Sequence, residues 1–167
     1  YPFSAHADTL EKDGVAVVEV SSFQLENIDS FHPAVSVILN ITPDHLDRHL
    51  NMETYASLKA RIFEQQLNDD VFVFNSLDKR VSEMADHAPC RTFPFGEKME
   101  NKDCAYAEGD ELVLFAAGRR MKIANTGDLL LKGEHNILNS LAAAAAAYTA
   151  GCSTDAISST LATFRGL

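Results

Sequence analysis

Apolar residues along this chain gather in short runs separated by polar stretches, the pattern of alternating strands and helices. Continuous β-branched and aromatic runs are typical of strands that are covered on both faces. We expect such strands at residues 15–20, 35–40, 71–75 and 91–95. We expect helices at residues 53–66, 77–88, 133–150 and about 153–164. This order predicts an α/β fold with a mostly parallel sheet flanked by helices.

The pattern changes between residues 103 and 131. Two short stretches, residues 111–116 and 119–124, are joined by Ala117-Gly118, a combination typical of a tight hairpin turn. We therefore expect a small antiparallel β patch beside the main sheet.

Polar residues that can bind metal or phosphate follow the first two predicted strands. Glu19, Ser21 and Ser22 come after residues 15–18, and Asp44, His45 and Asp47 come after residues 35–40. Ligands in open α/β sheets bind beyond the carboxyl ends of the strands. These side chains are therefore expected to cluster at one edge of the sheet.

Each candidate at the strand ends also has a structural interpretation. A carboxylate such as Glu19 at a strand end often caps a turn, although burying it without a partner is costly. An isolated loop histidine such as His45 is commonly a surface or packing residue. Asp44 and Asp47 are suited to capping a turn or pairing with Arg48.

The helical candidates have structural interpretations as well. The pattern around Lys59 is that of a surface lysine whose ammonium group reaches solvent. Ser21 and Gln24 are suited to local turn chemistry. Asn136, near the start of the predicted alanine-rich helix, is a possible N-cap.

Composition narrows the classes of function. The chain has 14 basic and 24 acidic residues and a net charge of −10, the opposite of the basic footprint of nucleic-acid-binding domains. No apolar run approaches the roughly 20 residues of a membrane-spanning helix. Cys90, Cys104 and Cys152 form no CxxC pair, so we expect incidental or buried thiols and a cytoplasmic location. A chain of 167 residues suits a single domain with one sizeable core.

Five motifs occur in order along the chain: Glu-Val-Ser-Ser-Phe-Gln-Leu-Glu at 19–26, Asn-Ile-Thr-Pro-Asp-His-Leu-Asp-Arg at 40–48, Tyr-Ala-Ser-Leu-Lys-Ala-Arg-Ile-Phe at 55–63, Gly-Glu-His-Asn-Ile-Leu-Asn at 133–139 and Thr-Phe-Arg-Gly-Leu at 163–167. Together they resemble the Mur ligases, the ATP-dependent amide-forming enzymes of bacterial peptidoglycan precursor synthesis. Within the family, the first motif is most similar to the member that adds D-glutamate to UDP-N-acetylmuramoyl-L-alanine.

The resemblance implies a domain organisation. Mur ligases have a UDP-binding domain, a central P-loop NTPase-like ATPase domain and a C-terminal amino-acid-binding domain. Their central domain opens with a Gly-Thr-Asn/Gly-Lys-Ser/Thr phosphate loop, and the printed sequence contains no such run. We expect residues 1–167 to be most of one central ATP-binding domain, without the phosphate-loop segment and the two outer domains. Such a chain alone is expected to be inactive.

The resemblance also implies roles for the candidates around the metal and the substrate. Glu19 matches a Mg²⁺ ligand and His45 matches a contributor to a second magnesium site. Lys59 matches the lysine that CO₂ carbamylates in this family, which turns a cation into an anionic oxygen ligand. Carbamylation requires the neutral amine, which partial burial favours. Ser21 and Gln24 match residues that face the UDP-muramoyl substrate.

A third group matches the nucleotide site. His135, Asn136 and Asn139 open the predicted alanine-rich helix and are expected to recognise adenine and ribose. The implied reaction transfers the γ-phosphate of ATP to the substrate carboxylate, and the amine of D-glutamate then displaces phosphate from the acyl phosphate. Two Mg²⁺ ions would neutralise the developing charge.

Two alternatives stay open. Folylpolyglutamate synthase has a related ATPase domain and the same chemistry, although Ser-Ser-Phe-Gln-Leu-Glu at 21–26 argues against a folate substrate. The other is a non-catalytic domain of the same fold.

We also expect self-association of the chain, because a sheet that lacks an internal neighbour exposes an edge or apolar surface.

Overall fold

A computed structural model of the chain describes residues 7–12, 14–43 and 51–166. The strands are β1 (Val35–Ile38), β2 (Val71–Asn75), β3 (Arg91–Gly96), β4 (Cys104–Glu108), β5 (Glu111–Ala116) and β6 (Arg119–Asn125). The α-helices are α1 (Ser22–Leu25), α3 (Met52–Ala60), α4 (Lys79–Ala85), α5 (Glu134–Thr149) and α6 (Thr154–Thr163). Short 3₁₀ turns are η2 (Ala7–Thr9), η3 (Arg61–Phe63) and η4 (Thr126–Asp128).

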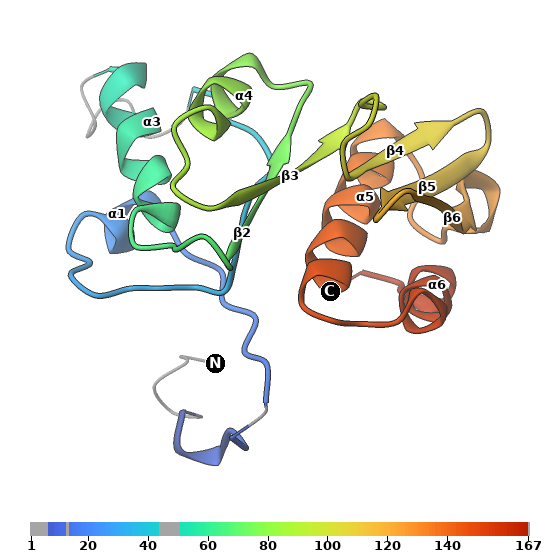
Figure 1. Cartoon of the computed structure of the whole chain (residues 1–167), viewed down its shortest axis with the longest axis horizontal. Coiled ribbons are helices and arrows are strands. Elements are labelled where there is room, and N and C mark those ends of the chain that lie inside the picture. Colours follow the sequence, from blue (N-terminus) through green and yellow to red (C-terminus); the bar gives the residue numbers. More distant parts are fainter. Residues whose placement is uncertain (1–6, 13, 44–50, 167) are drawn as a thin grey trace.

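The strands form one mixed sheet in the order β1-β2-β3-β4-β5-β6. Strands β1 to β4 pair in parallel, and β4, β5 and β6 pair antiparallel. The predicted α/β class with a small antiparallel patch is therefore confirmed, and the patch continues the main sheet (Figure 1). The hairpin turn between β5 and β6 has φ of 51° at Ala117 and 73° at Gly118. Positive φ at both central residues is the geometry of a type I′ turn, one of the two turns that two-residue hairpins favour.

Helices cover both faces of the parallel strands. Alternate residues of β2 point to opposite sides of the sheet, and because all of them are buried, both faces need cover. Phe72 and Phe74 pack with Tyr55 of α3 and Val81 of α4. Val73 belongs to the larger cluster on the other face, which joins the sheet to α5 and α6.

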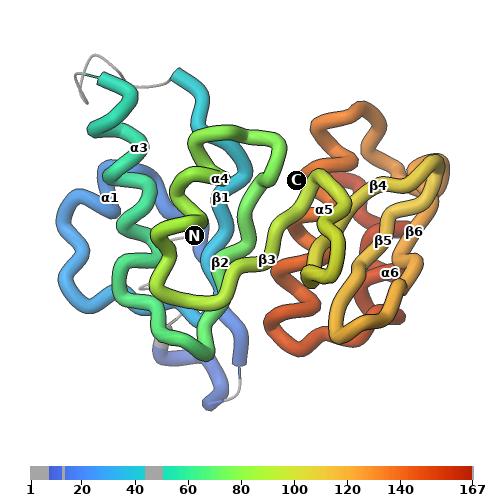
Figure 2. The backbone as a smooth tube through the Cα atoms, turned by 45° about the horizontal axis from the view of Figure 1, so that its top comes forward, coloured from blue at the N-terminus to red at the C-terminus, as the bar shows by residue number. Residues whose placement is uncertain are grey.

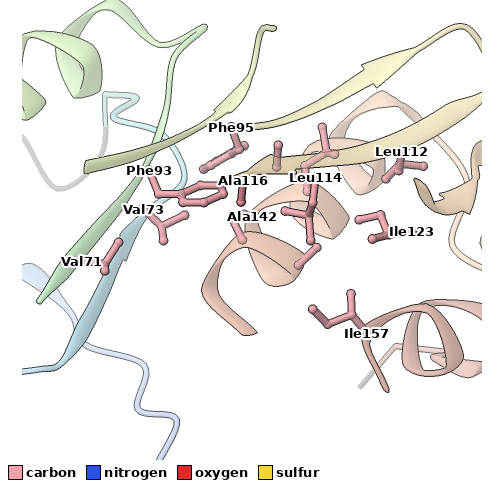
Figure 3. Packing of buried hydrophobic residues seen from close by; sticks show 14 of the residues in the cluster. Val71, Val73, Phe93, Phe95, Leu112, Leu114, Ala116, Ile123, Ala142 and Ile157 are labelled. Atoms are coloured by element: carbon pink, nitrogen blue, oxygen red, sulfur yellow. The ribbon is translucent and has the colours of Figure 1, made fainter. Parts of the chain in front are cut away.

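That larger cluster is the main core of the molecule (Figure 3). Phe93 and Phe95 of β3, Leu114 of β5 and Ala142 of α5 lie in it and are almost fully buried. Small alanine side chains let α5 approach the sheet closely, as the alanine-rich sequence predicts. Helix α6 closes the cluster with Ile157.

The predicted strand at residues 15–20 is wrong. This segment is extended but has no ladder partner among the described strands, and it runs outside the sheet (Figure 1). Val15 is 71% exposed and Val17 is 97% exposed. An apolar, β-branched run becomes a strand only where another strand accepts its hydrogen bonds. The edge of β1 that faces away from β2 has no partner among the described strands.

The predicted helix at residues 53–66 ends early. Helix α3 stops at Ala60 and η3 continues only to Phe63. The side chain of Gln66, the last residue of the predicted helix, is buried in the core. Its Nε2 donates to the carbonyl oxygens of Pro33 at 2.9 Å and Val71 at 3.2 Å. Its Oε1 accepts from the Ser36 hydroxyl at 2.8 Å.

The remaining predicted elements are close to those observed. The helix expected at 77–88 is shorter: it begins at Lys79 because Asp78 is its N-cap, and it ends at Ala85. The expected alanine-rich helix and last helix are α5 and α6. Over the described residues, no helix is long and apolar enough to cross a membrane.

The three cysteines are free, as the sequence suggested. Cys104 is buried, Cys90 is half-buried and Cys152 is exposed. Burial raises the pKa of the Cys90 and Cys104 thiols. A raised thiol pKa disfavours the reactive thiolate, so these two side chains are packing residues.

Candidate functional site

The carboxyl ends of β1 and β2 are tied together by two polar side chains. Asn75, the last residue of β2, donates from Nδ2 to the Leu39 carbonyl at 2.8 Å. The Asp78 carboxylate accepts from the Ile41 N–H at 2.8 Å and also caps the start of α4. These bonds fix the start of the segment that leads from β1 towards residue 44.

The hydrogen bonds of Asn75 and Asp78 were not predicted from the sequence. The signal was present, because Asn75 follows a buried strand and Asp78 stands at the start of a predicted helix. The sequence around these two residues does not indicate which backbone carbonyl or amide after β1 each side chain bonds.

The histidine candidate, His45, lies outside the described residues, as do its neighbours Asp44 and Asp47. Their predicted roles stay predictions.

Glu19 lies on the extended segment before α1 and its side chain is exposed. Because residues 15–20 form no strand, the expected position of Glu19 at the carboxyl edge of the sheet has no support from strand pairing. Because the Glu19 side chain is exposed, no burial cost requires it to have a partner.

Ser21 and Gln24 are brought together by the first turn of α1. The Ser21 N–H donates to Gln24 Oε1 at 2.8 Å, and the Gln24 N–H donates to Ser21 Oγ at 3.3 Å. This reciprocal pair is a capping box, which satisfies two backbone donors at a helix start. The structural interpretation, local turn chemistry, is therefore observed, and both side chains are exposed.

Lys59 lies near the end of α3 and is half-buried. Its Nζ stands 5.9 Å from the centre of the Tyr55 ring, one helical turn earlier. A cation over an aromatic face gains a modest electrostatic stabilisation. Half-burial of this side chain is compatible with the surface lysine expected from periodicity, whose stem packs while its ammonium group reaches solvent.

Helices α1 and α3 lie side by side (Figures 1 and 2). Arg61 joins them: its Nη1 donates to the carbonyl oxygens of Leu25 and Glu26, each at 2.7 Å. Its Nη2 donates to the Ile28 carbonyl at 2.9 Å. The structure therefore brings Ser21 and Gln24 into the same part of the molecule as Lys59.

The third group of candidates opens α5. Gly133 is the N-cap, with a φ of 107° that favours glycine, so an N-cap role for Asn136 is wrong. The Asn136 side chain instead donates from Nδ2 to the Lys132 carbonyl at 2.9 Å. The His135 ring covers Gly133, where an added Cβ would lie 3.0 Å from Cε1. His135 and Asn139 are exposed on adjacent turns of the helix.

A magnesium site is not assembled within the described residues. No three histidine, cysteine, aspartate or glutamate side chains converge there as potential metal ligands. Carboxylate and carbamate oxygens have the right chemistry for Mg²⁺, but Glu19 and Lys59 alone do not complete a site.

Two concave surfaces in the described part of the molecule are lined by other residues. A groove of about 520 Å³ runs between α3 and α4, with Ala56, Ala60 and Met84 among its lining residues. A second depression lies over β4 and β5, against Tyr106 and Phe115. Neither is lined by any of the predicted site residues.

The local basic group in the sequence, around Arg120 and Lys122, is paired with acidic residues. Arg120 contacts Glu108 at 2.9 Å and Glu111 at 2.7 Å, and Lys122 contacts Glu111 at 3.1 Å. Hydrogen bonds from Lys98 and then Arg120 lower the pKa of Glu108. Hydrogen bonds from Arg120 and then Lys122 lower the pKa of Glu111. These surface pairs bridge the three antiparallel strands.

Comparison with known proteins gives a consistent family. The family model described as "Mur ligase middle domain" matches residues 3–147. The chain is 41% identical over 167 residues to a UDP-N-acetylmuramoylalanine--D-glutamate ligase of Thermoanaerobacter sp. (strain X514). It is 44% identical over 151 residues to a ligase of the same name from Thermoanaerobacter pseudethanolicus. These matches cover 100% and 90% of the chain but only 37% and 33% of the relatives, so the chain spans about a third of their length.

Solved structures agree with the fold. A MurF crystal structure from Acinetobacter baumannii superposes with a TM-score of 0.66 at 25% identity, covering 81% of this chain and 30% of that one. FolC of E. coli, in complex with DHPP and ADP, superposes with a TM-score of 0.54 at 18% identity over 78% of this chain and 30% of that one, a likeness of fold alone. With one family model extending over residues 3–147 and one fold shared with its solved members, this chain belongs to the Mur ligase family and corresponds to its middle domain.

Proposed function

We propose that this chain is the central domain of a longer ligase that adds D-glutamate to UDP-N-acetylmuramoyl-L-alanine with ATP, in bacterial peptidoglycan precursor synthesis in the cytoplasm. The observation that carries the proposal is the 41% identity across the whole chain to a ligase named for this reaction. The phosphate-loop segment and the two outer domains are then parts of the longer protein.

The proposed reaction has two steps. The terminal alanine carboxylate attacks the γ-phosphorus of ATP, which forms an acyl phosphate and releases ADP. The D-glutamate amine then attacks the acyl carbon, an amide bond forms, and inorganic phosphate leaves with the bonding electron pair. The proton that the amine loses goes to a base or to solvent.

We assign the residues of this chain to three roles. Glu19, His45 and carbamylated Lys59 are proposed as ligands of two Mg²⁺ ions, which would neutralise charge on the transferred phosphoryl group. Ser21 and Gln24 are proposed to face the UDP-muramoyl substrate. His135, Asn136 and Asn139 are proposed to contact adenine and ribose. Support for the last group comes from geometry, since His135 and Asn139 are exposed at the start of α5 and the Asn136–Lys132 bond orders the turn before it.

The half-buried position of Lys59 supports the proposed carbamate. Added CO₂ would convert the Lys59 amine, once it has lost its proton, into a carboxylate-like group at a position where the sequence encodes no acidic side chain.

The test uses the full-length protein that carries this sequence. We expect phosphate release that requires UDP-N-acetylmuramoyl-L-alanine, D-glutamate and ATP together, with L-glutamate as the matched negative control. A folate substrate with glutamate tests the folylpolyglutamate synthase alternative. Turnover only with the folate would replace the proposal, and no turnover with either would favour the non-catalytic alternative.

A further inference from the structure

Arg61 makes an unusual set of contacts for a residue at the end of a helix. Its side chain leaves α3, crosses to α1 and donates to three backbone carbonyls, those of Leu25, Glu26 and Ile28, at 2.7 to 2.9 Å. Its Nε also donates to the Glu64 carboxylate at 2.9 Å, which orients the guanidinium from its other side. Every bond from a cation to a carbonyl is charge-assisted, and the planar fork of arginine fixes their direction.

The segment that receives these bonds has little stability of its own. Helix α1 is a single turn of four residues, and helices this short do not persist without tertiary support. The carbonyls of Leu25 and Glu26 lie at its carboxyl end, where helical carbonyls lack partners within the helix. Arg61 supplies these partners, while the capping box of Ser21 and Gln24 closes the other end.

Arg61 also lies two residues after Lys59. The same few residues of chain therefore carry the proposed carbamate and hold the segment that bears Ser21 and Gln24. Leu25 is fully buried, so the segment is packed as well as hydrogen-bonded.

We propose that Arg61 is a positioning residue that fixes the UDP-substrate segment, residues 19–28, relative to Lys59. The proposal rests on the proposed function, which assigns Ser21 and Gln24 to the substrate and Lys59 to the phosphoryl group. Through its three carbonyl contacts Arg61 sets the distance between the two, and it touches neither substrate nor nucleotide.

The first measurement is hydrogen exchange in the full-length protein. Arg61→Ala is expected to speed exchange at the amides of Leu25, Glu26 and Asn27, which bond within the segment to Ser21, Ser22 and Gln24. Arg120→Ala is the matched control, because the Arg120 guanidinium makes three hydrogen bonds, against four for Arg61, but lies on β6. Unchanged protection at these amides in Arg61→Ala would refute the contact's role.

The second measurement separates positioning from stability. In Arg61→Ala, the KM for UDP-N-acetylmuramoyl-L-alanine is expected to rise about tenfold, which corresponds to about 1.4 kcal/mol. The KM for ATP is expected to stay near normal, because the proposed nucleotide residues open α5 and Arg61 does not contact them. Arg61→Lys should recover part of the loss, since one ammonium group reaches only some of the carbonyls.

The outcomes are distinct. A lower melting temperature with both KM values unchanged would make Arg61 purely structural and overturn the proposal. Equal increases in both KM values would do the same, as would the same split in Arg120→Ala. If the unaltered protein shows no ligase turnover, the proposed function fails, and the exchange result alone decides whether Arg61 holds the segment.

Discussion

Ser21 and Gln24 cap each other across the single turn of α1, with the Ser21 N–H donating to Gln24 Oε1 at 2.8 Å. The same two side chains are the ones that the family resemblance assigns to the UDP-linked substrate. A side chain that orders its own turn presents a fixed surface to a ligand, so the two roles are compatible. They are also separable by mutation.

Gln24→Glu separates capping from substrate recognition. Glutamate serves as well as glutamine in a capping box, so we expect the free energy of unfolding to change by less than about 0.5 kcal/mol. The substitution replaces an amide with a negative charge, so the KM for UDP-N-acetylmuramoyl-L-alanine should rise in the full-length protein. Ser21→Ala is the comparison for a lost cap and should cost about 1 kcal/mol of stability. A Gln24→Glu protein with normal KM would restrict Gln24 to capping.

Lys59 provides the second prediction, also in the full-length protein. Lys59→Ala should lose most of its turnover, and added acetate should restore part of it by placing a carboxylate in the vacated space. Lys59→Arg should not respond to acetate, because its bulk and fixed charge stay in the site. Steady-state phosphate release with and without acetate measures both.

The control for Lys59 is Lys79, an exposed lysine at the start of α4. Lys79→Ala should keep its turnover and be indifferent to acetate. Near-normal turnover of Lys59→Ala without acetate would instead make Lys59 an ordinary packing residue of α3.

Gln66 offers a test of the core. Its side chain is 2% exposed and bonds Ser36, Pro33 and Val71. Gln66→Leu leaves the buried Ser36 hydroxyl without its acceptor and should lower the free energy of unfolding by about 1–3 kcal/mol. Gln65→Leu, at the exposed neighbouring position, should change it by less than about 0.5 kcal/mol. Urea denaturation compares the two, and equal midpoints would contradict the role of the buried network.

Asp70 predicts an acid-dependent loss of stability. Two hydrogen bonds to Asp70 Oδ2 lower the pKa of Asp70. The larger effect comes from the Leu67 N–H at 2.6 Å and the smaller from His32 Nε2 at 2.5 Å. A lowered folded pKa stabilises the fold above the ordinary aspartate value of about 4, and this contribution is lost as the pH falls through the lower value. Between pH 6 and pH 3, Asp70→Asn should therefore lose less stability than the unaltered chain. Asp69 is the exposed neighbouring residue, and Asp69→Asn should have the same free energy of unfolding as the unaltered chain at each pH. Identical dependence of this free energy on pH in all three proteins would refute the assignment.

The exposed apolar segment before α1 predicts self-association of the isolated chain. Val15 is 71% exposed, Val17 is 97% exposed and Val18 is 43% exposed, and exposed apolar strips of this kind favour contacts between molecules. Light scattering should show a mass that rises with concentration, and Val17→Lys should reduce the rise. Leu67→Lys, which changes an exposed leucine elsewhere, should not. A concentration-independent monomer before any substitution would contradict the prediction.

Much of the fold followed from local pattern. The buried run Val-Phe-Val-Phe at 71–74 needs cover on both faces, and it is the strand that α3, α4 and α5 enclose. Ala117-Gly118 adopts the positive φ values that a two-residue hairpin needs. The motifs at 19–26, 55–63 and 133–139 pointed to the family that the comparisons show.

The site was less accessible from sequence. Residues 15–20 have the composition of a strand, yet composition cannot say whether a neighbouring strand is present to pair with them. The capping role of Ser21 and Gln24 was available as a local interpretation, and the structure shows it. The docking of α1 against α3 was not, because it depends on which carbonyls lie within reach of Arg61 after folding.

The sequence by itself therefore determined the family, the mixed sheet and most of the helices and strands, since these depend on periodicity, turn chemistry and ordered motifs. Tertiary structure decided which polar side chains hold the chain in place: Asn75 and Asp78 at the ends of the strands, Gln66 in the core and Arg61 between two helices. Each of the four bonds a backbone group between 33 and 37 residues away, counted along the chain. A hydrogen bond needs its partners within about 3 Å, and only the folded chain brings groups so far apart in sequence to that distance.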